Sequence, residues 1–162
     1  MGDYEFYTTE YYKTLEEDTM KAARVIVPIV FKIIQPQSVI DVGCGHGSFL
    51  AAFKEQGVTD ILGIDGEWVN PELLKIPKEK FISVDFTKPF NLNRQFDLVM
   101  CLEVAEHIDR QYAGLFIDSL TRLGPIILFS AAIPFQNKGE DRYHVNEQWP
   151  EYWEKKFSMY GY

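Results

Sequence analysis

Val39-Ile-Asp-Val-Gly-Cys-Gly-His-Gly47 is the segment from which the fold of this chain is best inferred. An apolar run that contains Asp41 breaks into three alternating glycines, and a segment that can be helical follows. This pattern predicts a strand, a tight turn and a helix. Gly43, Gly45 and Gly47 permit positive φ angles and leave no Cβ atom between a ligand and the main chain. The segment therefore predicts a nucleotide-binding turn.

The spacing of the glycines and the acid before them indicate the kind of nucleotide. A dinucleotide turn has the pattern G-x-G-x-x-G and places a pyrophosphate at the N-terminus of the helix. Here the pattern is G-x-G-x-G, and Asp41 would repel a phosphate and attract an ammonium group. S-adenosylmethionine (SAM) fits this pattern, because it combines adenosine with an ammonium and a sulfonium group and has no phosphate. Considered alone, a glycine-rich connection that serves only chain geometry explains the motif as well.

Composition limits the size, location and partners of the protein. Its 162 residues suffice for one domain with a buried core. No apolar run is long enough to cross a bilayer and the first residues do not resemble a signal peptide, so we expect a cytoplasmic protein with no membrane partner. Packing explains Cys44 and Cys101, and no disulfide framework is indicated. The formal net charge of -8 argues against nucleic acid as a partner.

Short apolar runs alternate with segments of helical spacing along most of the chain. This alternation predicts an α/β fold, a doubly wound, mainly parallel sheet of Rossmann-like type with five parallel strands. A long helix is expected over about 15–34, with Pro28 kinking or dividing it. The strands are expected at 38–42, 61–65, 81–85, 96–101 and 126–132, and further helices at 48–56, 110–123 and 147–160.

Two of these strands end in an acid that suits an adenosine. Asp65 follows the glycines at a distance where a carboxylate accepts both ribose hydroxyls, with a helix N-cap as the structural alternative. Asp85 would accept the adenine amino group while Phe86 lies on the ring, although an Asp-Phe pair before Thr-Lys-Pro is also a turn signal. Because ligands bind beyond the carboxyl ends of parallel strands, we expect Asp41, Asp65, Asp85 and residues 101–103 to face one crevice.

Taken in order, these motifs resemble the class I SAM-dependent methyltransferases. The resemblance covers residues 39–132 and includes the run Phe96-Asp-Leu-Val-Met-Cys-Leu-Glu-Val-Ala-Glu-His107. It implies SAM as cofactor and S-adenosylhomocysteine as product, with the glycine turn on the methionine part and residues 101–103 on the methyl side. The cofactor-binding residues that it implies are Asp41, Gly43, Cys44, Gly45, Gly47, Asp65, Gly66, Asp85, Phe86, Leu102 and Glu103.

The segment Glu103-Val-Ala-Glu-His107 has a second interpretation. It looks like the metal-binding motif of the small-RNA 2′-O-methyltransferases and of the ubiquinone-pathway O-methyltransferases. On an α-helix, Glu103, Glu106 and His107 would share one face and could coordinate a divalent ion. Similar sequences occur in methyltransferases of this class without a metal, and acids in a first helical turn also stabilise the helix dipole. We expect no metal, with these three residues as the alternative ligands.

His144 lies in a polar segment beyond the fifth strand, where loops often cover the substrate. His107 or His144 is the candidate catalytic base that takes a proton from a hydroxyl as the methyl group moves. A histidine that is hydrogen-bonded within the loop is the structural alternative. The sulfonium charge already activates the methyl group, so alignment is the main contribution of the protein. The sequence leaves oxygen and nitrogen open as the acceptor atom.

We expect one domain over 1–162, with a helical segment at 1–36, a cofactor-binding core at 37–132, and a substrate loop and C-terminal helix at 133–162. The family usually adds an antiparallel pair of strands after that helix, and this pair is missing here, as in a truncated chain. The apolar run 126–132 would then form an open sheet edge, an aggregation hazard unless covered. A second subunit, a loop or a missing C-terminal segment is expected to cover it.

Transfer of methyl from SAM to a small-molecule or sugar-like acceptor is the function that these observations favour. Two alternatives stay open. One is a metal-dependent RNA 2′-O-methyltransferase, against which the net charge argues. The other is a methyltransferase-like binding domain that is catalytically inactive.

Overall fold

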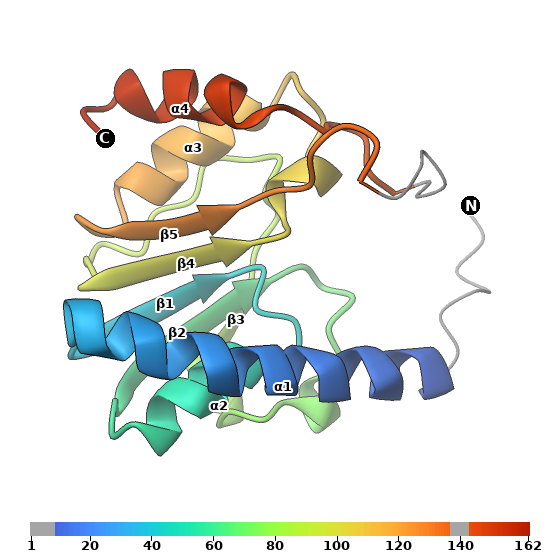
Figure 1. Ribbon diagram of the computed structural model, residues 1–162, viewed down its shortest axis with the longest axis vertical. Coiled ribbons are helices and arrows are strands. Elements are labelled where there is room, and N and C mark those ends of the chain that lie inside the picture. The colour runs from blue at the N-terminus through green and yellow to red at the C-terminus, as the bar shows by residue number, and fades with distance from the viewer. Residues whose placement is uncertain (1–8, 137–142) are drawn as a thin grey trace.

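The computed structural model describes residues 9–136 and 143–162, with side chains from residue 17 onwards. Its five strands are all parallel and lie in the order β3-β2-β1-β4-β5, which confirms the predicted doubly wound sheet (Figure 1). The elements are α1 (Thr9–Ile34), β1 (Ser38–Val42), α2 (Ser48–Glu55), β2 (Asp60–Asp65), β3 (Phe81–Ser83), β4 (Leu98–Leu102), α3 (Ala113–Thr121), β5 (Ile127–Ser130) and α4 (Pro150–Ser158). Short 3₁₀ helices are η2 (Pro71–Leu73), η3 (Lys78–Lys80) and η4 (Ala105–His107).

The central strands β1 and β4 are buried on both faces, and their neighbouring residues point to opposite sides of the sheet. Val39 and Leu98 belong to the core cluster beneath α1 and α2, whereas Ile40 and Val99 belong to the cluster beneath α3 and α4. Figure 1 shows these two pairs of helices on opposite sides of the sheet. Because all five strands are parallel, their carboxyl ends lie at the same edge of the sheet.

Helix α1 runs through Pro28 without division, so that part of the prediction is wrong. Proline removes one helical hydrogen bond and crowds the preceding turn. Here Ala23, Val27 and Val30 are buried on both sides of the proline within one core cluster, which α2 shares. Packing of both halves of the helix against the same core therefore keeps the helix continuous across Pro28.

Three of the predicted elements are shorter in the structure than expected, and local turns or a proline explain where each begins or ends. Strand β3 ends at Ser83 because the Asp85 carboxylate accepts the Thr87 amide and starts a turn. Helix α3 begins at Ala113, three residues late, because Asp109 accepts the Gln111 amide in a turn of its own. Helix α4 begins at Pro150, a residue suited to the first helical position.

Strand β5 is an edge of the sheet among the described residues, as expected. Its outer side borders an apolar groove of about 430 Å³ that α4 closes from the other side. Phe129, Trp153 and Phe157 line the groove, and their rings pack against one another with centroids 5.1–5.4 Å apart. Aromatic side chains from α4 thus cover part of the face beside the open edge.

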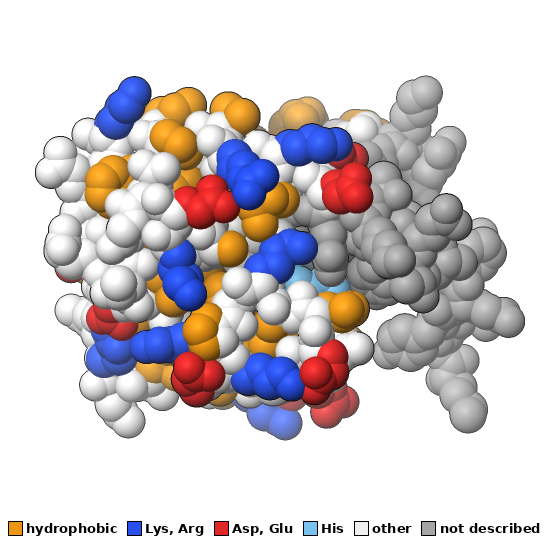
Figure 2. Space-filling view, turned by 90° about the horizontal axis from the view of Figure 1, so that it is seen from below, with side chains coloured by type: hydrophobic (Ala, Val, Ile, Leu, Met, Phe, Trp, Pro, Cys, Tyr) orange, Lys and Arg blue, Asp and Glu red, His pale blue; other side chains and the backbone are white. Residues whose placement is uncertain are grey.

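Figure 2 shows the face that lies below the sheet in Figure 1, where Lys and Arg side chains are interspersed with Asp and Glu. The visible side chains of this face thus form a mixed surface rather than a field of one sign. Across the ranges 9–136 and 143–162, no helix combines the length and the hydropathy that a membrane span requires.

Candidate active site

The glycine turn between β1 and α2 has the backbone conformation that its sequence predicts. Gly43, Gly45 and Gly47 have φ angles of 80°, 52° and 83°. A Cβ atom on Gly43 would lie 2.2 Å from a methyl group of Val104, so this glycine is required by packing. A Cβ atom on Gly45 would meet nothing within 4 Å, so open space adjoins the main chain there. A ligand can therefore approach the turn at Gly45.

Asp41 and Asp65 lie near the carboxyl ends of neighbouring parallel strands and are 4% and 7% exposed. Burial raises the pKa of Asp41 to about 7, and the charge of Asp65 adds to this. Burial also raises the pKa of Asp65, although the Gly45 and Gly66 amides oppose it by donating to its carboxylate at 2.7 Å each. Burial disfavours the charged form of both acids, and a cation such as the ammonium group of SAM would stabilise that form.

Asp85 and Phe86 have structural roles that the sequence left open. The Asp85 carboxylate accepts the Thr87 amide at 3.0 Å and its hydroxyl at 2.6 Å and pairs with Lys88, and the Thr87 bonds in particular lower its pKa to about 2. The Phe86 ring is buried against Phe90 and Phe116. A turn and the core explain both residues, and their contacts with adenine stay a prediction.

Trp68 is a residue beside the cofactor side that the motifs do not single out. Its indole lies over Gly66, where a Cβ atom would come within 2.1 Å of the ring. It also lowers the pKa of Asp65 through a side-chain hydrogen bond. The side chain is 72% exposed. Trp68 could have been found from the sequence as an aromatic residue three positions after Asp65, the acid that ends β2.

The end of β4 is strained at Glu103, which has a φ of 56°. A non-glycine residue in this region costs about 1–2 kcal/mol, and such strain gathers at functional sites. The Ser130 hydroxyl donates to the Glu103 carboxylate at 2.6 Å and holds it toward β5. The predicted α-helical face over 103–107 is wrong, because only Ala105–His107 turns, as a 3₁₀ helix. Glu103 therefore does not share a helical face with Glu106.

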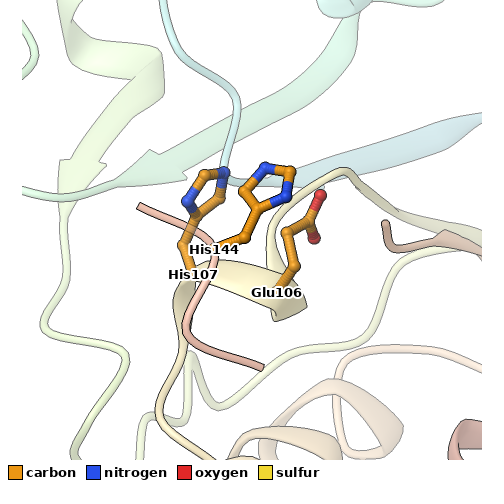
Figure 3. Close-up of side chains that lie close together, drawn as sticks. All are labelled: Glu106, His107 and His144. Atoms are coloured by element: carbon orange, nitrogen blue, oxygen red, sulfur yellow. The ribbon is translucent and has the colours of Figure 1, made fainter. Parts of the chain in front are cut away.

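Glu106, His107 and His144 form the group that this strained turn creates. One possible ligand atom from each lies within 4.8 Å of the others, and Figure 3 shows the His144 ring between the His107 ring and the Glu106 carboxylate. The ring centroids of the two histidines are 4.8 Å apart. In the described residues, the predicted metal alternative is thus corrected: His144 joins this group in place of Glu103.

The Glu106 carboxylate is fully buried, and neither of its oxygens has a hydrogen-bond partner within residues 9–136 and 143–162. Burial raises its pKa to about 7, and the charge of Glu103 adds to this, while nearby backbone amides and His144 oppose it. A buried carboxylate without donors is costly unless a proton or a cation accompanies it. This feature indicates a site for one or the other.

Hydrogen bonds on the outer nitrogens orient both histidines. Nδ1 of His107 lies 3.1 Å from the Tyr143 carbonyl, and Nδ1 of His144 lies 3.0 Å from Oε1 of Glu147. Because both partners are acceptors, each Nδ1 carries a proton. If either ring acts as a base or a metal ligand, the atom involved would therefore be its Nε2.

The backbone ties the His144 segment to η4. The amides of Val145 and Asn146 both donate to the Glu106 carbonyl at 2.9 Å. Residues almost forty positions apart are thereby brought into one group. Its chemistry is that of proton transfer or of a divalent cation with one carboxylate and two imidazoles.

Comparison with known proteins agrees with this architecture. Residues 15–154 match the sequence profile of a family described as methyltransferase domain. The chain belongs to this family of methyltransferase domains. A segment of 106 residues, 62% of the chain, is 28% identical to the ribosomal protein L11 methyltransferase of Laribacter hongkongensis. The match covers 34% of that relative, so this domain spans about a third of its length.

Solved structures share the fold of this methyltransferase domain. A SAM-dependent methyltransferase from Archaeoglobus fulgidus has a TM-score of 0.65 and 22% identity, covering 93% of this chain and 74% of that one. The methyltransferase domain of the bacterial protein CtHen1 has a TM-score of 0.67 and 21% identity, with coverages of 88% and 86%. The class I methyltransferase fold predicted from the ordered motifs is thereby confirmed.

Proposed function

We propose that this methyltransferase domain transfers the methyl group of SAM to a hydroxyl of a small-molecule or sugar-like acceptor and releases S-adenosylhomocysteine. Membership of the family supports SAM as the donor. The open main chain at Gly45 and the buried acids Asp41 and Asp65 support binding of its methionine and ribose parts. Leu102 and Glu103, at the end of β4, are proposed to lie on the methyl side.

The group Glu106, His107 and His144 is the observation that favours oxygen over nitrogen. A neutral amine attacks a sulfonium methyl group without a base, whereas a hydroxyl must lose its proton as the bond forms. The imidazoles of His107 and His144 and the buried carboxylate of Glu106, whose pKa is raised to about 7, are the groups placed together here that could accept that proton. In this mechanism the sulfur–carbon bond breaks as the oxygen–carbon bond forms.

The same group supports a second candidate, in which a divalent cation assists the transfer. The unpartnered carboxylate of Glu106 fits such an ion, as do the two oriented imidazoles. Glu106, His107 and His144 would hold it, and it would lower the pKa of a nearby acceptor hydroxyl. Glu147 would then orient the ring of His144 by accepting a hydrogen bond from its Nδ1, as acceptors commonly do for metal-binding histidines.

RNA as acceptor and an inactive binding domain are the remaining alternatives. The net charge of -8 disfavours the phosphate backbone of RNA. The domain division at 36 and 132, a single domain over 1–162 and a cytoplasmic location also stay proposals. We propose that a second subunit or further chain covers the open edge of β5 beside its apolar groove.

Calorimetry with SAM and S-adenosylhomocysteine tests the proposal first. Saturable binding of both supports it, and the absence of heat at high ligand concentration would leave the inactive domain as the better interpretation. Thermal unfolding with Mn²⁺ then separates the two mechanisms. The cation candidate requires a rise in melting temperature that Glu106→Gln removes and the exposed control Glu151→Gln keeps. No rise, with methyl transfer unaffected by a chelator, would leave the base mechanism.

A further inference from the structure

Exposed apolar side chains lie on two segments that hydrogen-bond to the Glu106, His107 and His144 group or to Glu147 beside it. These segments, 133–136 and 143–149, lie after β5 and before α4. Phe135 is 78% exposed, and each of the others is more than a third exposed. We call this set the acceptor rim: Ile133, Phe135, Tyr143, Val145 and Trp149. Exposed apolar groups gathered beside a polar centre are a common property of ligand sites.

Phe135 is also held in an unfavourable backbone conformation. Its φ of 71° lies in the left-handed region, which bulky side chains rarely adopt. Its amide donates to Oε2 of Glu147 at 3.1 Å, and the Ile133 amide donates to the Gln136 side chain at 3.1 Å. The fold thus holds a large aromatic ring in solvent against a backbone preference that glycine or asparagine would satisfy.

One carboxylate connects this ring to the reacting group. Oε1 of Glu147 pairs with Nδ1 of His144 at 3.0 Å, while Oε2 accepts the amide of Phe135. The Glu147 side chain is 19% exposed, so solvent screens these bonds only partly. The bond that orients His144 and the bond that holds the Phe135 amide thus share one carboxylate. This link makes the rim part of the site rather than a separate surface.

We propose that the acceptor rim binds the flat apolar face of an uncharged ring that carries the acceptor hydroxyl, with Phe135 as the stacking residue and Glu147 as a positioning residue. The inference rests on the proposed methyl transfer and specifies its acceptor. Aromatic rings stack on the apolar faces of sugars and of hydroxylated aromatic rings alike. Glu147 bonds to His144, and Glu103 precedes the turn that carries Glu106, so acidic side chains near the group would repel an anionic acceptor.

Binding of ring-shaped probes tests the inference independently of turnover. Saturation-transfer NMR on the full chain with S-adenosylhomocysteine would use catechol, methyl β-glucopyranoside and the linear control 1,2-propanediol. We expect transfer to at least one ring and none to the linear diol, and the ring that binds identifies the source of the acceptor. Phe135→Ala should weaken that binding about tenfold, whereas Tyr160→Ala, in the turn that follows α4, should leave it unchanged.

Two outcomes would overturn the inference while the proposed function stands. One is S-adenosylhomocysteine binding without transfer to any ring. The other is equal ring binding by wild type and Phe135→Ala. If S-adenosylhomocysteine itself does not bind, the proposed function fails, and the contrast between wild type and Phe135→Ala on the ligand-free chain still decides the role of the rim.

Stability and kinetics separate a binding role from a structural one. Phe135→Gly should melt about 2–4 °C above Phe135→Ala, because glycine tolerates the left-handed φ, yet bind rings as weakly. Glu147→Gln cannot accept from both His144 and Phe135, so it should raise the acceptor KM and lower kcat together. An effect on KM alone would remove Glu147 from the positioning role.

Discussion

The proposed cofactor half and the proposed acceptor half of the site are built in opposite ways. The cofactor half, at the ends of β1 and β2, uses main-chain amides and two acids within 25 positions, Asp41 to Asp65. The acceptor half, at the ends of β4 and β5, joins η4 to a segment about forty positions later and contains two non-glycine residues with positive φ. Local motifs thus build the proposed donor site, whereas long-range contacts build the proposed acceptor site.

Glu106→Gln should have the largest effect on turnover while leaving the affinity for SAM almost unchanged. Loss of the buried carboxylate removes a proton acceptor or a metal ligand, and we expect kcat to fall about 10²–10⁴-fold. The affinity for SAM should change less than about twofold, because Glu106 belongs to the other half. Steady-state kinetics with calorimetry on the same preparation measures both, with Glu151→Gln as an exposed control on α4. An equal loss of SAM affinity would show that the halves are not separate.

The difference between local motifs and long-range contacts explains which parts of the site could be predicted from the sequence. The G-x-G-x-G pattern and Asp65 lie within one βαβ unit, so spacing alone places them at adjacent strand ends. The role of His144 beside Glu106 depends on two amides that donate to one carbonyl, and no periodicity encodes this. The predicted α-helical face failed because the chain leaves β4 with Glu103 in a left-handed conformation, which a sequence pattern does not reveal.

Asp65→Asn should act on the cofactor half alone. It weakens an acceptor of the Gly45 and Gly66 amides and of the expected ribose hydroxyls, so SAM affinity should fall about 10–100-fold. The value of kcat at saturating SAM should change little. Asp60→Asn, at the other end of β2 in an exposed pair with Arg94, is the matched control. Unchanged affinity in Asp65→Asn would contradict the ribose assignment.

The pH dependence of SAM binding should identify Asp41. Its pKa of about 7 in the ligand-free protein means that protonation competes with the ammonium group below neutral pH. Affinity should rise with pH, by up to about tenfold per unit below pH 7, and level off above it. The folding stability of the SAM-free protein should depend on pH in the opposite direction. The raised pKa of Asp41 stabilises the folded state at low pH, and this contribution is lost as pH rises through 7. Calorimetry from pH 5.5 to 8.5 should show a flat profile for Asp41→Asn.

The two halves touch where Gly43 packs on Val104, and the smallest predicted effect concerns this contact. A Cβ atom on Gly43 would clash with Val104, which directly precedes η4. Gly43→Ala should therefore destabilise the domain through the clash and through its positive φ, and Val104→Ala should relieve only the clash. Urea unfolding of the four variants of this double-mutant cycle should give a favourable coupling of about 1 kcal/mol. Additive effects would mean that the backbone shifts to absorb the methyl group. In that case the strain at Glu103, rather than this contact, would set the position of the acceptor half relative to the cofactor turn.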